Sequence, residues 1–228
     1  VDFILKFTFV TLFPNLIEPY FHDSILKRAI ESNFISYEFY NPRDFTTNKH
    51  KKVDDQMVGG GAGMLLLCQP LFDCLNEIKS KDSDAYIIFP LAAAKPFRQN
   101  DAKRLAKKKN IVFVSGRYEG IDERVIEKYA NEVFSIGEFV LTGGELPSLV
   151  MADAIARNVK DVLGNADSLD VESYENNLLE APSFTKPEIF QKLSVVKEFL
   201  KGNHSKISDL KIQMSKCKTK YYRPNKEK

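Results

Sequence analysis

The most regular pattern in the chain lies between residues 86 and 157, where apolar runs of strand length alternate with stretches of helical period. The expected strands are residues 86–91, 111–115, 133–136 and 139–141. The expected helices are residues 100–109, 122–130 and 146–157. This alternation predicts an α/β fold with a largely parallel sheet. In such sheets the loops that leave the carboxyl ends of the strands line the ligand crevice.

The N-terminal third contains two further apolar runs and one candidate helix. Residues 3–12 form an apolar run that ends at Phe13-Pro14, and a second apolar patch covers residues 34–40. A candidate helix begins at Ser24 between them. Residues 41–63 are polar and rich in glycine, which predicts a long functional loop.

The chain changes character beyond the last expected helix. Residues 164–187 are rich in Asn, Asp and Ser, which predicts a linker. Two sets of apolar residues with helical spacing follow: Ile189, Leu193, Val196 and Leu200, and then Ile207, Leu210, Met214 and Cys217. We therefore expect an α/β domain over residues 1–163, a linker over 164–187 and a small helical domain over 188–228.

Charge is distributed unevenly, although the whole chain carries a formal net charge of only +2. Residues 186–228 hold 12 basic and 4 acidic side chains, so this segment is strongly cationic while the rest of the chain is acidic. One interpretation is a solvated, lysine-rich surface. The other is a basic module that binds a phosphate backbone.

Composition limits the class of protein further. With 228 residues, 43% of them hydrophobic and 28% charged, the chain can bury a core without disulfides or metal ions. Its three cysteines form no CxxC pair, which argues against a disulfide framework and a cysteine-rich zinc site. The longest apolar stretch, residues 86–94, is far shorter than the roughly 20 residues of a membrane helix. We expect a cytoplasmic protein that does not enter membranes.

Residues 59–63, Gly-Gly-Gly-Ala-Gly, contain the letters of a phosphate-binding loop. They lack the Lys-Ser/Thr pair that follows such a loop, which disfavours a nucleotide hydrolase. A flexible loop with positive φ angles is the alternative, and Gly143-Gly144 could likewise serve only a sharp turn from strand to helix.

Acid and base candidates are numerous, and their positions alone do not select among them. The carboxylates considered are Asp54, Asp55, Glu119, Asp122, Glu123, Glu138, Glu145 and Glu172. The three histidines, His22, His50 and His204, are far apart and lack metal-ligand spacing, so we expect no zinc site.

Ten motifs in order resemble one family. They are Thr11-Leu-Phe-Pro14, Asn41-Pro-Arg-Asp-Phe-Thr46, Lys49-His50, Val53-Asp-Asp55, Gly59-Gly-Gly-Ala-Gly-Met64, Gly116-Arg-Tyr-Glu-Gly-Ile-Asp-Glu-Arg124, Ser135-Ile-Gly-Glu-Phe-Val-Leu-Thr-Gly-Gly-Glu-Leu-Pro147, Asp153-Ala-Ile-Ala-Arg157, Val162-Leu-Gly164 and Gly202-Asn-His204. This series, from about Phe3 to Pro224, resembles the bacterial tRNA (guanine-N1)-methyltransferases, or TrmD family, of the SPOUT class. These enzymes methylate the guanine 3′ of the anticodon.

The resemblance implies a SPOUT-type domain with a deep trefoil knot, a homodimer and S-adenosylmethionine as methyl donor. The general rules of chain topology would not predict a knot. The cofactor residues that it implies are Phe89, Pro90, Leu91, Ala92, Gly116, Tyr118, Glu119, Gly120, Ser135, Ile136, Gly137, Phe139, Leu141, Gly143, Gly144 and Pro147. A magnesium requirement is also implied by the resemblance, although we identify no protein-only metal site.

The resemblance also implies catalytic and substrate residues. Glu172 matches the acidic general base that accepts the guanine N1 proton, and Arg157 matches the arginine that stabilises charge on the base. Ser168 in the linker and the basic C-terminal domain would hold the anticodon stem-loop of tRNA. Substrate contacts across the dimer would come from Arg28, His50 and Asp54.

The chain departs from the family pattern at the first cofactor loop. Residues 89–94 read Phe-Pro-Leu-Ala-Ala-Ala, whereas the family usually has Tyr-Leu-Ser-Pro-Gln-Gly. The C-terminal Lys218-Thr-Lys-Tyr-Tyr-Arg-Pro224 keeps one arginine where the family has more. An alternative is therefore a non-catalytic RNA-binding homologue with a degenerate cofactor pocket.

Overall fold

A computed structural model describes residues 4–164, 172–174 and 177–224 of the chain. The chain divides into two compact units, Val1–Gly164 and Asn165–Lys228, and each is considered separately. No helix in the described residues is both long enough and apolar enough to cross a membrane.

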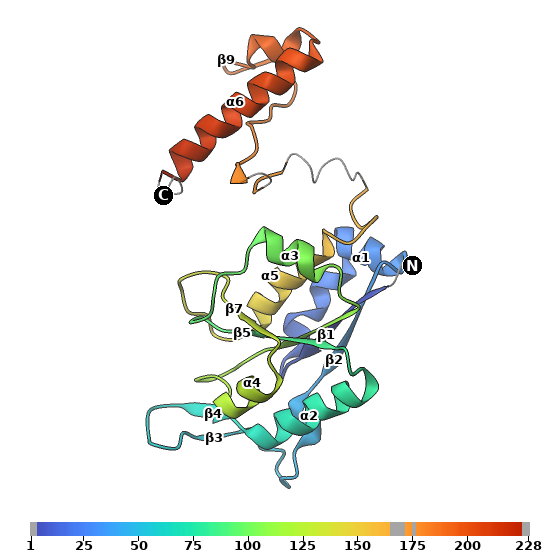
Figure 1. The fold of residues 1–228 in the computed structure, drawn as a ribbon, viewed down its shortest axis with the longest axis vertical. Helices are drawn as coiled ribbons and strands as arrows, with labels where there is room; N and C mark the ends of the chain where they lie inside the picture. The colour runs from blue at the N-terminus through green and yellow to red at the C-terminus, as the bar shows by residue number, and fades with distance from the viewer. Residues whose placement is uncertain (1–3, 165–171, 175–176, 225–228) are drawn as a thin grey trace. The chain divides into compact units, whose positions relative to one another are not determined.

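The first unit is built on a five-stranded parallel sheet with the strand order β2-β1-β6-β5-β7 (Figure 1). The strands are β1 (Leu5–Val10), β2 (Ile35–Tyr40), β5 (Tyr86–Pro90), β6 (Asn110–Val114) and β7 (Glu132–Phe134). The expected α/β fold with a parallel sheet is confirmed. All five residues of β6 are buried. This is expected of a central strand in a parallel sheet that is covered on both faces.

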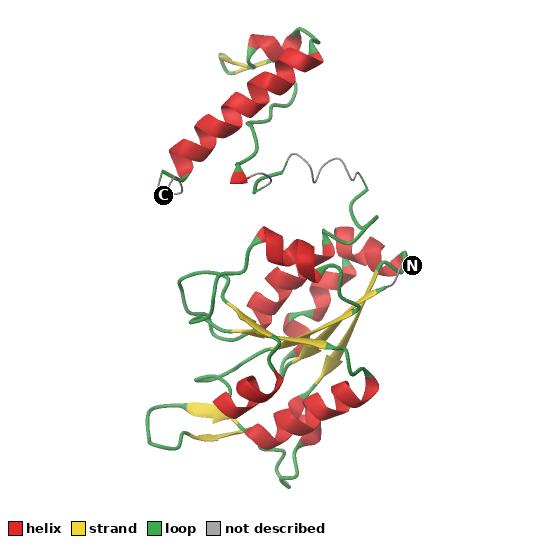
Figure 2. Cartoon of the chain, in the orientation of Figure 1, coloured by secondary structure: helices red, strands yellow, loops and turns green. Residues whose placement is uncertain are grey.

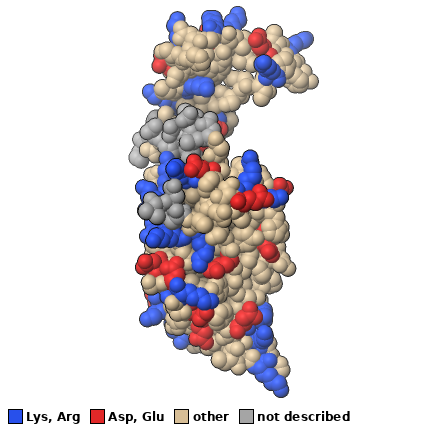
Figure 3. Space-filling model, turned by 90° about the vertical axis from the view of Figure 1, so that its right-hand side faces the viewer, with Lys and Arg blue, Asp and Glu red and all other residues tan. Residues whose placement is uncertain are grey.

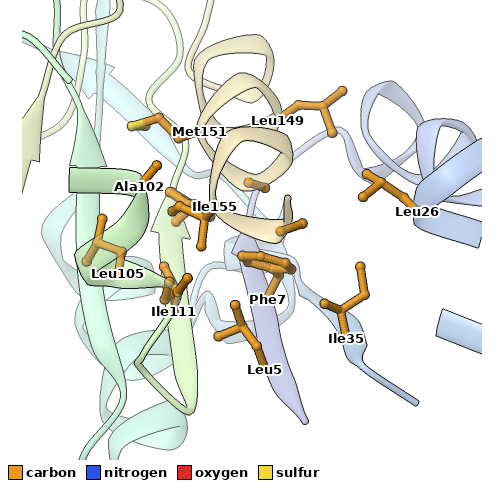
Figure 4. Close-up of a cluster of buried hydrophobic side chains, with 14 of the residues drawn as sticks. Leu5, Phe7, Leu26, Ile35, Ala102, Leu105, Ile111, Leu149, Met151 and Ile155 are labelled. Atoms are coloured by element: carbon orange, nitrogen blue, oxygen red, sulfur yellow. The ribbon is translucent and has the colours of Figure 1, made fainter. Parts of the chain in front are cut away.

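Helices cover both faces of this sheet (Figure 2). They are α1 (Ser24–Glu31), α2 (Cys68–Lys81), α3 (Gln99–Leu105), α4 (Glu123–Tyr129) and α5 (Glu145–Ala156). Side chains alternate between two cores: Ile111 and Phe113 of β6 belong to one cluster, whereas Val112 and Val114 belong to the other. Figure 4 shows the first cluster, in which Ile155 of α5 lies over the strands.

Two expectations for the first unit are wrong. Residues 139–141 form no strand, and Phe139 and Val140 are 55% and 85% exposed, because these side chains lie in a loop outside the core. Residues 41–63 are not a continuous loop, since they contain a short 3-10 helix, Pro42–Phe45, and the strand β3 (Asp54–Gln56). β3 forms an antiparallel hairpin with β4 (Met64–Leu66).

The second unit contains one long helix, α6 (His204–Tyr222), as expected from the second set of spaced apolar residues. The first set forms no α-helix. It forms a hairpin of β8 (Ile189–Phe190) and β9 (Leu193–Ser194), followed by a 3-10 helix, Lys197–Leu200. The two residues between β8 and β9, Gln191 and Lys192, have φ angles of 47° and 67°, as in a type I′ hairpin turn. The prediction of a fully helical C-terminal domain is therefore wrong.

Candidate functional site

Three segments that follow neighbouring parallel strands line one pocket in the first unit. They follow β5, β6 and β7 at the carboxyl ends of these strands, where open α/β sheets bind their ligands. The lining residues are Pro90, Leu91, Ala92, Gly116, Arg117, Tyr118, Glu119, Gly120, Ile121, Phe134, Ser135, Ile136, Gly137, Phe139, Val140, Leu141, Gly143, Gly144 and Pro147. Every residue that the resemblance assigned to the cofactor is among them except Phe89.

The Phe89 side chain is fully buried in a hydrophobic cluster, so it does not face the pocket. Its position in β5 explains this, because successive side chains of a strand point to opposite faces of the sheet. Pro90, the last residue of β5, and the two residues after it line the pocket. The structure therefore assigns Phe89 to the core.

Two glycines bring the second and third segments into backbone contact. The Gly144 N–H donates a hydrogen bond of 2.8 Å to the Gly116 carbonyl oxygen. A β-carbon on Gly144 would lie 2.8 Å from the Gly116 nitrogen and 2.8 Å from the Ser115 α-carbon. Because both neighbours are backbone atoms, the two segments can pack this closely only if residue 144 has no side chain.

A buried ion pair joins the same two segments to the end of β1. Arg117 Nε lies 2.8 Å from Glu145 Oε2, and the Thr11 hydroxyl donates a hydrogen bond of 2.7 Å to Glu145 Oε1. The Glu145 side chain is 3% exposed and the Arg117 side chain is 17% exposed. Arg117 also donates to the Thr142 carbonyl oxygen and lies over the Phe13 ring. Arg117 is not among the site residues expected from the sequence, although it lies inside the Gly116-Arg-Tyr-Glu-Gly motif.

The segment that follows β5, which lacks the family's glycine, is joined to β7 and the residue after it by backbone hydrogen bonds. Leu91 N–H donates to the Phe134 carbonyl, and Ser135 N–H donates to the Lys95 carbonyl. The Lys95 ammonium lies 2.7 Å from Glu132 Oε2. Burial opposes ionisation of Glu132, but hydrogen bonds from Lys95, Tyr86 and Arg104 outweigh it and lower the pKa of this carboxyl. Within the altered stretch, residues 90–92 therefore still form one wall of the pocket.

The expected catalytic pair is divided between the two units. Arg157 is the residue after α5 in the first unit, where it lines a surface pocket with Tyr20 and Asp153. The Tyr20 hydroxyl donates a hydrogen bond of 2.7 Å to Asp153, which raises the pKa of Tyr20. Glu172 is half-buried in the second unit.

The expected substrate residues occupy separate elements. Arg28 is exposed on α1, His50 is exposed in the loop before β3, and Asp54 is half-buried at the start of β3. Ser168 lies outside the described residues. Among the described side chains, no group of three or more His, Cys, Asp or Glu could hold a metal ion.

Basic residues are exposed on both units (Figure 3). In the second unit, α6 carries lysines at positions 206, 211, 216, 218 and 220, and it buries none of its residues. An exposed cationic helix of this kind is suited to binding a phosphate backbone.

One apolar surface of the first unit is exposed beside Arg157. Leu146 and Val150 of α5 are 56% and 44% exposed, and Tyr20 is 49% exposed. These three side chains line the same surface pocket. Contiguous exposed apolar side chains are typical of an interaction surface.

Comparison with known proteins gives a consistent result over the whole chain. Residues 5–228 match the sequence profile of the family described as tRNA (guanine-1)-methyltransferase TrmD. A protein of Sulfurimonas denitrificans named tRNA (guanine-N(1)-)-methyltransferase is 66% identical over 220 residues, covering 96% of this chain and 95% of its own length. Proteins of the same name from Sulfurovum sp. and Campylobacter curvus are 65% and 62% identical over 221 residues, covering 97% of this chain and 97% and 94% of their own lengths.

Proposed function

The chain belongs to the tRNA (guanine-1)-methyltransferase family TrmD, and from this premise we propose that it methylates N1 of the guanine 3′ of the anticodon in tRNA. The match over residues 5–228 carries this proposal, because it spans both the pocket-bearing unit and the basic unit. The family and the names of the relatives support an enzyme, and they do not support the non-catalytic RNA-binding alternative.

We propose S-adenosylmethionine as the methyl donor. The pocket suits it in two ways: the apolar side chains of Leu91, Ile136 and Pro147 offer a contact surface for the flat adenine ring, and Glu119 supplies a carboxylate in the same lining. A carboxylate attracts the positively charged sulfonium and amino groups of the donor. When bound, this cofactor supplies a methyl group on a positively charged sulfur, which is already activated for displacement.

The protein's own contribution is to position the guanine and to move one proton. We propose that the Glu172 carboxylate accepts the proton from guanine N1. The Arg157 guanidinium would donate hydrogen bonds to the guanine O6, where negative charge develops as the proton leaves. Arg157 therefore makes N1 more acidic, and Glu172 removes its proton.

We propose that the basic second unit holds the anticodon stem-loop. Its lysines would neutralise phosphates while Ser168, Arg28, His50 and Asp54 contact the loop that carries the guanine. The target guanine must leave its stack to reach the pocket. A tRNA substrate favours a cytoplasmic location, and a magnesium requirement follows only from the family resemblance.

We propose that two copies of the chain form a homodimer through the apolar surface around Tyr20, Leu146 and Val150. An isologous pairing would cover this patch on both copies. Arg157 borders the patch, so the partner copy would lie next to one of the two proposed catalytic residues. The family's deep trefoil knot is part of the same proposal for the α/β unit.

The identity of the methylated atom tests the proposed function. We expect digestion of tRNA treated with the enzyme and S-adenosylmethionine to release 1-methylguanosine. The matched control is the same tRNA with adenine in place of the guanine 3′ of the anticodon, which should gain no methyl group. A ribose-methylated nucleoside, or methylation of the control, would contradict the proposal.

A Gly144→Ala variant tests the cofactor pocket. The new methyl group would meet backbone atoms of Ser115 and Gly116 and push two lining segments apart. Overpacking of this kind costs about 1–3 kcal/mol, so we expect calorimetry to show roughly 5- to 150-fold weaker binding of S-adenosylmethionine. Gly164→Ala is the control, because a β-carbon there would have no atom of the described residues within 4 Å. Equal affinities for the two variants would exclude the pocket as the cofactor site.

A further inference from the structure

Gly63, in the glycine-rich hairpin loop between β3 and β4, lies against Glu119, which lines the pocket. A β-carbon on Gly63 would lie 2.5 Å from Glu119 Oε1, 2.6 Å from Glu119 Cγ and 2.9 Å from Glu119 Cδ. The Glu119 side chain therefore lies directly against the α-carbon of Gly63. The contact includes Cγ as well as the carboxylate, so rotation of the carboxylate alone would not relieve it.

Backbone hydrogen bonds hold the two segments in register at this contact. The Glu119 N–H donates a bond of 2.9 Å to the Met64 carbonyl oxygen, one residue beyond Gly63. The Leu66 N–H donates a bond of 3.0 Å to the Gly120 carbonyl oxygen. Neither backbone can move away to make room for a side chain at residue 63 without losing these bonds. The Glu119 side chain, which is exposed, is the part that can move.

Gly60, in the same loop, allows the effect of this contact to be distinguished from the effect of backbone conformation. Gly60 has a φ of +84° and Gly63 a φ of +89°, so a β-carbon is equally strained at both. A β-carbon on Gly60 would have no atom within 4 Å in the part of the chain that the structure describes. The two positions therefore differ in their neighbours and not in their backbone requirement.

We propose that Gly63 is a positioning residue that lets the Glu119 carboxylate lie across the base of the hairpin, facing the sulfonium group of S-adenosylmethionine. This inference rests on the proposed cofactor. A methyl group at residue 63 displaces the Glu119 side chain while the fold persists. The hairpin that carries Asp54 on its other strand thereby sets the electrostatics of the cofactor pocket.

The test compares the affinities of Gly63→Ala and Gly60→Ala for two ligands by isothermal titration calorimetry. S-Adenosylmethionine carries the sulfonium charge, whereas S-adenosylhomocysteine lacks the methyl group, has a neutral thioether in its place and keeps the rest of the molecule. We expect Gly63→Ala to lower the preference for S-adenosylmethionine over S-adenosylhomocysteine about fivefold, the size of an exposed charge pair. Gly60→Ala should keep the preference of the unmodified enzyme. A purely structural defect would weaken both ligands alike and would overturn the proposal.

A Glu119→Gln variant makes the test independent of how well Gly63→Ala folds. It should lower the same preference about fivefold, and adding Gly63→Ala to it should lower the preference no further, because both changes act on one carboxylate. An unchanged preference in Glu119→Gln, or additive effects in the double variant, would overturn the proposal. Failure of the unmodified enzyme to bind either ligand would instead contradict the proposed cofactor.

Discussion

A Glu172→Gln variant is expected to slow the methyl-transfer step by roughly 10²–10⁴-fold, the usual contribution of a general base. The amide of Gln keeps the size of the side chain but cannot accept the guanine N1 proton at neutral pH. The affinity for S-adenosylmethionine should stay unchanged, because Glu172 lies outside the three segments that line the pocket. Single-turnover kinetics on an anticodon stem-loop, with enzyme in excess, measures the chemical step directly.

The matched control for this experiment is Glu180→Gln, which changes an exposed carboxylate in the same unit. Its rate should equal that of the unmodified enzyme. We also expect Arg157→Ala to lower the rate at every pH, since the arginine makes the guanine more acidic whatever the bulk pH. A Glu172→Gln rate within a few-fold of the unmodified enzyme would remove Glu172 from the mechanism.

The parallel sheet could be predicted from the sequence because its strands are buried on both faces. Such strands give continuous apolar runs, and the runs at residues 86–91 and 111–115 coincide closely with β5 and β6. Residues 139–141 give the same signal for a different reason. Their apolar side chains line a pocket, and hydrophobicity alone does not distinguish a pocket wall from a core.

The C-terminal hairpin could not be predicted from spacing. Ile189 and Leu193 are four residues apart, which fits one turn of a helix and also fits a two-residue turn between short strands. The turn residues Gln191 and Lys192 lack the Asn-Gly type of signal that marks such hairpins.

Helix α2 is not among the elements expected from the sequence. Its buried residues Leu71, Leu75 and Ile78 nevertheless follow helical spacing, so the sequence does contain a signal for this helix.

The pocket could be placed from the strand ends, but the ion pair that supports it could not. Arg117 and Glu145 belong to segments after different strands, and only folding of the sheet brings them together. Glu145 was one of eight candidate carboxylates with no feature to select it. Its burial, at 2% exposure, and its contact with Thr11 distinguish it only in the folded chain.

A Glu145→Ala variant is expected to lower the free energy of unfolding by about 3 kcal/mol. Removing one partner of a buried ion pair leaves the other charge without compensation, at a cost of about 3–5 kcal/mol. We take the lower end because the Arg117 side chain keeps 17% exposure to water. For a chain of this size the melting temperature should fall by roughly 10 °C. Urea and thermal unfolding, followed by circular dichroism without added ligand, measure both quantities.

The double variant Glu145→Leu/Arg117→Met separates the uncompensated charge from the loss of packing. Replacing both ions of a buried pair by apolar residues of similar volume is often neutral or stabilising, so this variant should recover most of the lost stability. Thr11 would still accept the hydrogen bond of 2.9 Å from the Phe13 N–H. Two results would contradict this account: a free energy of unfolding for Glu145→Ala within about 1 kcal/mol of that of the unmodified chain, or a double variant less stable than Glu145→Ala. Either would show that Glu145 does not stabilise the fold by compensating the charge on Arg117.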